Sequence, residues 1–149
     1  MSLSVRRARP GDALGVRKLL QELGYQIGDA RASDETIAQV VRHPEAAVFV
    51  AVEGVATVVG YIAVSHRPLM RLGGRLATVD ELVVMESRRG QGIGTQLLEA
   101  AMAHARSLHC VRIEVEQRRG RESYERGYYQ RRGFVEVDSA VLRIDWKKE

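Results

Sequence analysis

Apolar residues alternate with polar ones in some segments and recur every three or four positions in others, which separates predicted strands from predicted helices. The alternation from Leu3 to Arg9 predicts a first strand. Pro10-Gly-Asp12 breaks this pattern, and a helix is predicted to follow and to end at Gly24. Ser33-Asp34 combines two residue types that cap helices, so a second helix is expected to begin there and to end at His43-Pro44.

Three strands are predicted in the middle of the chain. Ala46 to Val52 and Val58 to Val64 are β-branched runs joined through Glu53-Gly54, which predicts a hairpin. A loop is expected from Arg67 to Arg75. Leu76 to Val84 then predicts a strand that is apolar on both faces, as central strands are.

A glycine-rich turn and a long amphipathic helix follow. The apolar positions of this helix fall on one side, at Leu97, Leu98, Ala101, Met102, Ala105 and Leu108. Val111 to Val115 predicts a fifth strand, residues 122 to 131 a short helix, and Phe134 to Ile144 a closing strand or hairpin. The order β-α-α-β-β-β-α-β-α-β predicts an α/β (α+β) fold, a mixed sheet with helices packed on it.

Composition indicates a single soluble domain across residues 1–149, because 45% of the residues are apolar, 28% are charged and no linker or repeat interrupts them. No apolar run approaches the roughly 18 residues needed to span a bilayer, so no membrane partner is expected. The first residues lack the apolar core of a signal peptide, so a cytoplasmic location is expected. Cys110 is the only cysteine, which excludes an intramolecular disulfide and a cysteine-based zinc site.

The net charge is +4, and nearly all basic residues are arginines, since the only lysines are Lys18, Lys147 and Lys148. The arginines are spread along the chain, whereas nucleic-acid-binding proteins usually gather them on one element. No nucleic-acid partner is therefore expected. Arginine binds phosphate and carboxylate with two nitrogens, so one anionic ligand is compatible with this composition.

The segment from Val83 to Thr95 runs from a predicted buried strand through three glycines into a helix. Glycine allows positive φ and lets the backbone approach a ligand closely. Unpaired N–H groups and the helix dipole attract phosphate at such a helix start. Arg88 and Arg89 add charge there, so the segment suits a pyrophosphate. Its spacing differs from the dinucleotide fingerprint, and it lacks the lysine of a Walker loop. The alternative is a connection that only turns the chain.

Three motifs resemble the GNAT superfamily of N-acetyltransferases: Arg89-x-x-Gly92-x-Gly94, Asp80-Glu-Leu-Val-Val, and Tyr129-Gln-Arg-Arg-Gly-Phe134. The resemblance implies a mixed, mostly antiparallel sheet whose fourth and fifth strands splay apart. It implies acetyl-CoA as acyl donor, with no metal, and its pantetheine arm paired with the backbone of Leu82, Val83 and Val84. The pyrophosphate is expected on N–H groups of Arg89, Gly90, Gln91, Gly92, Ile93, Gly94 and Thr95. Homodimers are common among similar proteins, so a homodimer is one expectation.

Asp80 and Glu81 stand in an otherwise apolar strand, where an acid is costly to bury unless it is paired or used. Neighbouring side chains point to opposite faces unless a bulge intervenes, so one of the two is expected to face the acyl group. Glu81 reaches further and matches a glutamate proposed as base in small-molecule members of the family, so we expect Glu81 to be the general base, with Asp80 as the alternative. The competing interpretation is a carboxylate paired with an arginine such as Arg112.

Tyr129 matches the tyrosine that in similar enzymes protonates the departing sulfur, and Tyr128 is expected to pack. A shift of one residue in the alignment would exchange these roles. The local pattern also departs from the family: Glu125 stands where alanine is usual, and Arg121 lies eight residues before Tyr129, where seven is usual.

The sequence therefore predicts an N-acetyltransferase that moves an acetyl group from acetyl-CoA to a small amine by direct attack in a ternary complex. A protein or peptide acetyltransferase, a non-catalytic acyl-CoA sensor and a nucleic-acid-binding module are the alternatives. Acceptor choice is expected in Gln21 to Arg42 and in Arg67 to Arg75, where Arg67 and Arg71 suit an anionic amine. His66 ends the third predicted strand near the acceptor and is expected at the surface.

Overall fold

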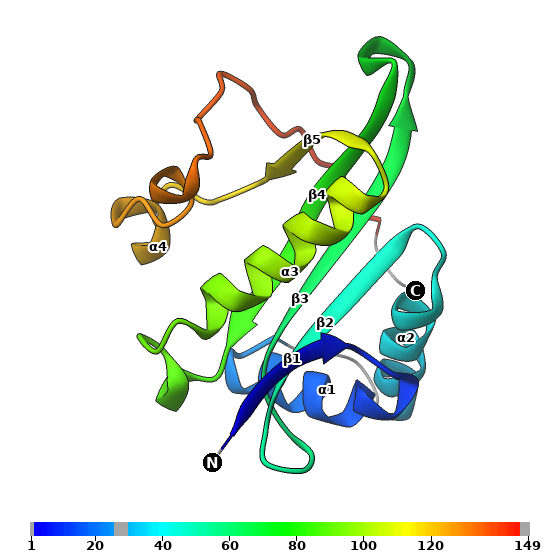
Figure 1. Cartoon of the computed structure of the whole chain (residues 1–149), viewed down its shortest axis with the longest axis vertical. Coiled ribbons are helices and arrows are strands. Elements are labelled where there is room, and N and C mark those ends of the chain that lie inside the picture. The colour runs from blue at the N-terminus through cyan, green and yellow to red at the C-terminus, as the bar shows by residue number, and fades with distance from the viewer. Residues whose placement is uncertain (1, 26–29, 147–149) are drawn as a thin grey trace. The chain divides into compact units, whose positions relative to one another are not determined.

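The fold was obtained as a computed structural model that describes residues 2–25 and 30–146, without the side chains of residues 30–32. Residues 26–29, within the segment expected to select the acceptor, lie outside the described residues. The chain divides into two compact units, Met1–Glu116 and Gln117–Glu149 (Figure 1). That residues 1–149 act as a single domain stays a prediction. No described helix is long and apolar enough to cross a membrane.

A five-stranded sheet forms the centre of the first unit. Its strands follow one another in chain order, and the first four are antiparallel to their neighbours, whereas β5 runs parallel to β4. The strands are β1 (Leu3–Arg7), β2 (Ala46–Glu53), β3 (Thr57–Leu69), β4 (Gly74–Val84) and β5 (Cys110–Val115). This confirms the predicted α/β fold with a mixed, mostly antiparallel sheet.

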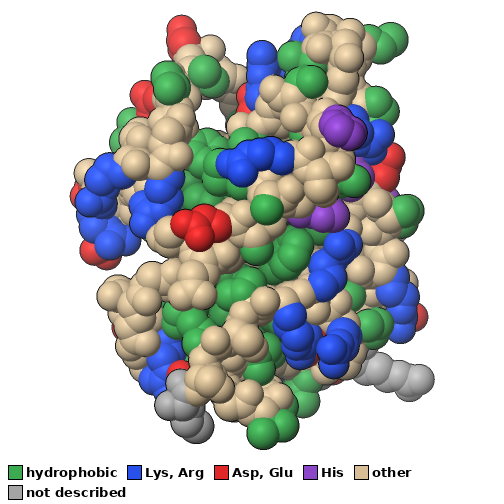
Figure 2. Space-filling model, in the orientation of Figure 1, with side chains coloured by type: hydrophobic (Ala, Val, Ile, Leu, Met, Phe, Trp, Pro, Cys, Tyr) green, Lys and Arg blue, Asp and Glu red, His purple; other side chains and the backbone are tan. Residues whose placement is uncertain are grey.

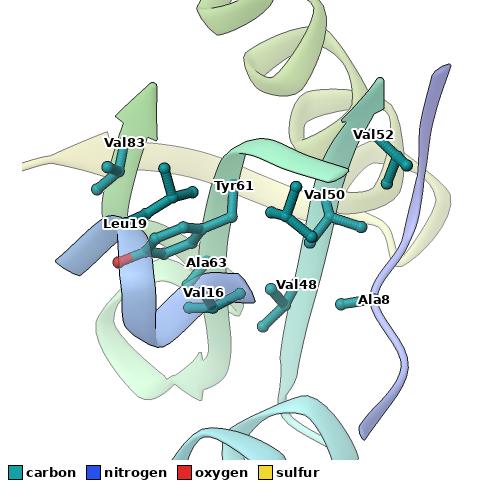
Figure 3. Close-up of a cluster of buried hydrophobic side chains, with 10 residues drawn as sticks. Ala8, Val16, Leu19, Val48, Val50, Val52, Tyr61, Ala63 and Val83 are labelled. Atoms are coloured by element: carbon teal, nitrogen blue, oxygen red, sulfur yellow. The ribbon is translucent and has the colours of Figure 1, made fainter. Parts of the chain in front are cut away.

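Helices cover both faces of this sheet. They are α1 (Ala13–Glu22), α2 (Ala30–Arg42) and α3 (Ile93–Ser107). Tyr61 of β3 shares an apolar cluster with Leu19 of α1 (Figure 3). A Cβ added to the preceding residue, Gly60, would lie 3.2 Å from Cδ1 of Leu97 in α3. Because consecutive residues of a strand point to opposite faces, α1 and α3 lie on opposite sides of the sheet.

The second helix begins earlier than predicted. Ser33 and Asp34 do not cap it but lie within α2. Ser33 is only 4% exposed, and Asp34 accepts a hydrogen bond from Nε of Arg17 at 2.6 Å. The side chains of Ser33 and Asp34 therefore contribute to the packing of α2 and its contact with α1, and they do not cap the start of α2.

The loop expected from Arg67 to Arg75 is a tight hairpin. β3 continues to Leu69, a 3-10 turn covers Met70–Leu72, and β4 starts at Gly74. Gly73 closes the turn with φ of 62°, a conformation that favours glycine. Pro68 is tolerated because the pairing of β2 with β3 reaches only Ser65, so the missing N–H of Pro68 removes no bond to β2.

The second unit contains less regular structure than predicted. The helix expected over residues 122 to 131 is divided into α4 (Glu122–Glu125) and a 3-10 turn (Gln130–Arg132), with Gly127 at φ of 65° between them. The closing strand expected from Phe134 to Ile144 is wrong, since none of these residues pairs with a described strand. Val135 and Val137 keep the alternation of a strand, yet both are exposed, and alternation without a hydrogen-bonded neighbour does not make a strand.

Basic side chains are distributed, as the sequence indicates. Lys and Arg occur at several separate places on the face shown in Figure 2, with apolar and uncharged surface between them. Several arginines of the first unit are held by carboxylates, including Arg6 by Asp12 at 2.8 Å and Arg17 by Asp34 at 2.6 Å.

Candidate active site

A β-bulge places both acids of β4 on one face of the sheet. Ala63 lies opposite Glu81, but the next residue of β3, Val64, lies opposite Val79, so Asp80 is an extra residue in β4. The Tyr61 hydroxyl donates to Oε2 of Glu81 at 3.2 Å, and Ser65 hydrogen-bonds Asp80. Tyr61 and Ser65 are four residues apart on β3 and therefore share a face. The expectation that only one of the two acids faces the acyl group assumed a strand without a bulge. Because of the bulge, Asp80 and Glu81 lie on the same face as a pair of carboxylates.

The surroundings of the pair favour the protonated acids. Protein atoms displace part of the water around Glu81 and raise the pKa of its carboxyl, although the residue keeps access to solvent. The hydrogen bond from Tyr61 lowers this pKa, and the Asp80 charge raises it again. Burial also raises the pKa of Asp80, against the hydrogen bond from Ser65 and the charge of Arg67. Both carboxyls therefore hold a proton more readily than exposed acids do, a property that is frequent at functional sites.

One edge of β4 lacks a partner strand after the bulge. β5 pairs with β4 only from Arg75 to Val79. From Glu81 to Val84, β4 pairs with β3 on one side and with no described strand on the other. The predicted splaying of the fourth and fifth strands is confirmed. Leu82, Val83 and Val84 thus lie on a strand edge that an extended amide-containing chain can pair with.

The turn after β4 leads directly from this edge into α3. Gly90 and Gly92 have φ of 78° and 81°, which L side chains rarely adopt, and no atom lies within 4 Å of a Cβ built on either. The N–H of Gln96 donates to the carbonyl of Gly92 at 3.1 Å, so α3 begins at this glycine. Ile93 is 3% exposed, so its side chain anchors the helix while the backbone of Gln91 to Thr95 forms the helix start.

The two arginines of the turn have different partners. Arg88 forms a two-point ion pair with Glu53 of β2, which offsets its charge, and its contribution to the phosphate site stays a prediction. Nε of Arg89 donates to the carbonyl of Val84 at 3.2 Å, and the Arg89 N–H donates to the carbonyl of Glu86 at 3.3 Å. Arg89 is exposed beside the glycines, so among these two arginines it is the one whose guanidinium can reach a ligand there.

Tyr129 and Tyr128 lie in the second unit and are described there by themselves. Tyr129 is 9% exposed, with its ring edge-to-face against Tyr128 at 5.0 Å and Phe134 at 5.4 Å. Burial raises the pKa of Tyr129 to about 12. The Arg132 guanidinium lies 3.7 Å from the centre of the Tyr128 ring, and the buried Tyr128 hydroxyl has no hydrogen-bond partner among the described residues. Tyr129 thus keeps its phenolic proton at neutral pH.

Three further expectations from the sequence concern Arg112, His66 and a metal site. No ion pair joins Arg112 to Asp80 or Glu81 in the described part of the chain. The charge of Arg67 acts on Asp80, so pairing with an arginine stays the competing interpretation for that acid. His66 is 9% exposed, so its expected surface position is wrong. Its Nδ1 accepts a hydrogen bond from Nε of Arg75 at 3.2 Å. Within residues 2–25 and 30–146, no group of three His, Cys, Asp or Glu could hold a metal ion.

Sequence reasoning missed Tyr61, which contacts the candidate base. A signal was present, because Tyr61 is the one residue with a hydroxyl in the apolar run from Val58 to Val64. Its ring satisfies the apolar pattern, and this hides the polar atom at its end.

Comparisons with known proteins agree with this fold. The chain matches the acetyltransferase (GNAT) family over residues 14–134. No curated protein sequence matches significantly. Similar solved structures include an acetyltransferase from Trypanosoma brucei (22% identity, TM-score 0.81, 97% of this chain and 100% of that chain). Glucosamine-6-phosphate N-acetyltransferase from Arabidopsis thaliana is also similar (17%, 0.81, 97% and 99%). So is ribosomal-protein-alanine N-acetyltransferase from Brucella melitensis (20%, 0.75, 97% and 100%). The chain belongs to the GNAT acetyltransferase family and is an acyltransferase enzyme.

Proposed function

We propose that this enzyme transfers an acetyl group from acetyl-CoA to the amine of a small molecule, by direct attack in a ternary complex. One observation carries the proposal: the unpaired edge of β4 runs from the carboxylates at the bulge to the turn at Gly90 and Gly92. Three features therefore follow one another along β4 and the turn after it: the carboxylates for the acceptor amine, a strand edge for an extended arm, and a helix start for phosphate.

The residues of this strand and turn fit the donor. The backbone of Leu82, Val83 and Val84 offers N–H and C=O groups to the amides of the pantetheine arm. The turn from Arg89 to Thr95 offers helix-start amides and the Arg89 guanidinium to the pyrophosphate. When bound, acetyl-CoA supplies an acyl group that is already activated as a thioester. A backbone amide near Val83 is proposed to polarise the acyl carbonyl.

Glu81 is proposed to take the proton from the incoming ammonium. A primary ammonium has a pKa of about 10.4 in water, so little free amine exists at neutral pH. The raised pKa of Glu81 brings this base closer to neutral pH, where a general base is most effective. Tyr129 is proposed to give its proton to the departing sulfur, since its raised pKa keeps the hydroxyl protonated.

The acceptor is proposed to be a small amine that also carries an anionic group. Asp80 and Glu81 attract an ammonium, and Arg67 acts on Asp80 from the adjoining hairpin. The similar enzyme from Arabidopsis thaliana has glucosamine-6-phosphate in its name, an amine with a phosphate. The similar enzyme from Brucella melitensis has a ribosomal protein in its name. A peptide is therefore the alternative acceptor to test.

The test is thiol release from acetyl-CoA with a panel of amines, run beside calorimetry of acetyl-CoA binding. The panel contains amino-sugar phosphates, aminoalkylphosphonates, neutral amino sugars, polyamines and a peptide with a free N-terminus. Turnover that is fastest with the phosphorylated or phosphonate amines supports the proposal. Turnover with the peptide alone would replace the small amine by a protein acceptor, and binding without turnover on any amine would make the chain an acyl-CoA sensor.

A further inference from the structure

The side chain of Tyr61 joins the apolar core to the candidate base. Tyr61 is 1% exposed, and its hydroxyl donates to Oε2 of Glu81 at 3.2 Å. We infer that Tyr61 is a positioning residue that holds the Glu81 carboxylate in place and in its ionised form. The inference rests on the proposed role of Glu81 for its effect on catalysis, but the contact itself belongs to the unliganded protein.

Packing leaves the Tyr61 ring little freedom. The ring shares a cluster with Val16 and Leu19 of α1, Val50 of β2 and Val83 of β4. Figure 3 shows the ring beside Leu19 and Val16, with its oxygen pointing away from Val50. A close-packed core fixes side-chain orientation. The position of the Tyr61 hydroxyl is therefore set by packing against α1, β2 and β4 and does not depend on the hydrogen bond to Glu81.

The hydroxyl acts on one protonation state of Glu81. Burial and then the charge of Glu81 raise the pKa of Tyr61 far above neutrality, so its hydroxyl remains a donor. A donor stabilises the carboxylate and not the carboxylic acid. It opposes partial desolvation and the Asp80 charge, both of which favour protonated Glu81. Among the described residues, Tyr25, which lies after α1, also acts on this contact and raises the pKa of Tyr61.

Removal of the hydroxyl alone tests the inference. Tyr61→Phe keeps the ring and its packing, so the fold is expected to survive. The pKa of Glu81 is expected to rise by about one pH unit, the effect of one hydrogen bond to a charged group at a site that keeps some solvent. The acid limb of the pH profile of kcat/KM should move upward by the same amount, while the rate at high pH is largely retained.

Tyr124→Phe is the matched control. The Tyr124 hydroxyl donates to Oε1 of Glu136 at 2.6 Å, so the same chemical group is removed from another tyrosine–glutamate pair, in the second unit. This variant is expected to leave both the titration of Glu81 and the pH profile unchanged. Carbon-13 NMR of labelled glutamate carboxyls follows the titration, with Glu81→Gln assigning the Glu81 signal.

The two measurements separate the inference from the proposed function. A higher pKa of Glu81 together with a shifted acid limb supports both. A higher pKa with an unmoved acid limb supports the positioning by Tyr61 and rejects Glu81 as the base. An unchanged pKa in Tyr61→Phe, whatever happens to the rate, overturns the inference. The NMR titration needs no acceptor, so it gives a result even if every amine of the panel fails.

Discussion

Arg88 holds Glu53 at two points: its Nε lies 2.8 Å from Oε2 and its Nη2 lies 2.9 Å from Oε1. The pair connects the turn after β4 to the end of β2 and lowers the pKa of Glu53, first through the hydrogen bond and also through the charge of Arg88. Such a two-point pair fixes orientation as well as distance. We therefore expect the side chain of Arg88 to orient the proposed phosphate turn rather than to contact a ligand.

We predict that Arg88→Ala and Glu53→Ala weaken acetyl-CoA binding to a similar degree, because each releases the same turn. The Arg88→Ala/Glu53→Ala double variant should bind no more weakly than either single variant, since residues that act as a pair are not additive. Calorimetry of all three variants measures this. Full addition of the two losses would mean that Arg88 contacts the ligand by itself.

Glu81→Gln should reduce turnover by about 100-fold near neutral pH, the usual contribution of a general base. The deficit should be largest above the acid limb, where Glu81 of the wild type is ionised and the amine is still mostly protonated. It should narrow below the acid limb, where the wild type has also lost its base, and again as the pH approaches the pKa of the amine. Acetyl-CoA affinity, measured by calorimetry, should change little. Asp80→Asn provides the comparison: if it removes the acid limb of kcat/KM and Glu81→Gln does not, Asp80 is the base.

Gly92→Val should abolish acetyl-CoA binding. The substitution places a branched side chain where the diphosphate is proposed to lie, at a φ of 81° that costs an L residue about 1–2 kcal/mol. Gly73→Val is the control, since Gly73 has φ of 62° and equally open surroundings but lies in the β3–β4 hairpin. Both variants should melt at lower temperature, and only Gly92→Val should lose binding. Equal affinity in the two variants would reject the turn as the phosphate site.

Tyr129→Phe should slow the release of thiol at every pH below the pKa of Tyr129, because the proton for the departing sulfur is removed. Tyr128→Phe is the paired variant, and it removes a buried hydroxyl that has no hydrogen-bond partner in the described residues. Single-turnover measurement of thiol release compares the two. If thiol release is slow in Tyr128→Phe and normal in Tyr129→Phe, Tyr128 and not Tyr129 is the proton donor.

Stability should fall on acidification through two histidines. Burial, with the charges of Arg75 and Arg7, lowers the pKa of His66, and burial lowers that of His104, whose ring lies 6.3 Å away. A pKa that is lower in the folded state means that the unfolded chain takes up the proton first. The contribution of these groups to stability is therefore lost as the pH falls through about 6.5 and becomes constant below the folded-state pKa.

Thermal unfolding of His66→Gln between pH 7.5 and 5 tests this. The variant should be less stable at pH 7.5, and the difference from the wild type should narrow as the pH falls. His109→Asn, at an exposed position with φ of 58°, serves as the control. A constant difference across this range would show that protonation of His66 does not affect stability.

Local sequence patterns were enough for much of the fold and for the turn. The β-branched runs of β2 and β3 and the glycines before α3 carry their structure within a few residues, because strand propensity and positive φ are local properties. The closing strand failed for the same reason: Val135 and Val137 show the local pattern, but a strand also requires a partner, which the pattern does not contain.

The contacts that define the candidate site are not local. The bulge at Asp80 results from the register between β3 and β4, and nothing near Asp80 in the sequence sets that register. Arg88 and Glu53 are 35 residues apart, and Tyr61 and Glu81 are 20 apart. The sequence therefore predicted which chemical groups could take part in the site, whereas the sheet register determines which of these side chains contact one another.

A crystal structure of the enzyme with acetyl-CoA tests the central claim most directly. We predict that the diphosphate lies within hydrogen-bond distance of N–H groups between Gly90 and Thr95. The pantetheine amides should pair with the edge of β4 at Leu82 to Val84, with the thioester beside Glu81. A diphosphate bound away from the start of α3, or a pantetheine arm away from this edge, would contradict the account.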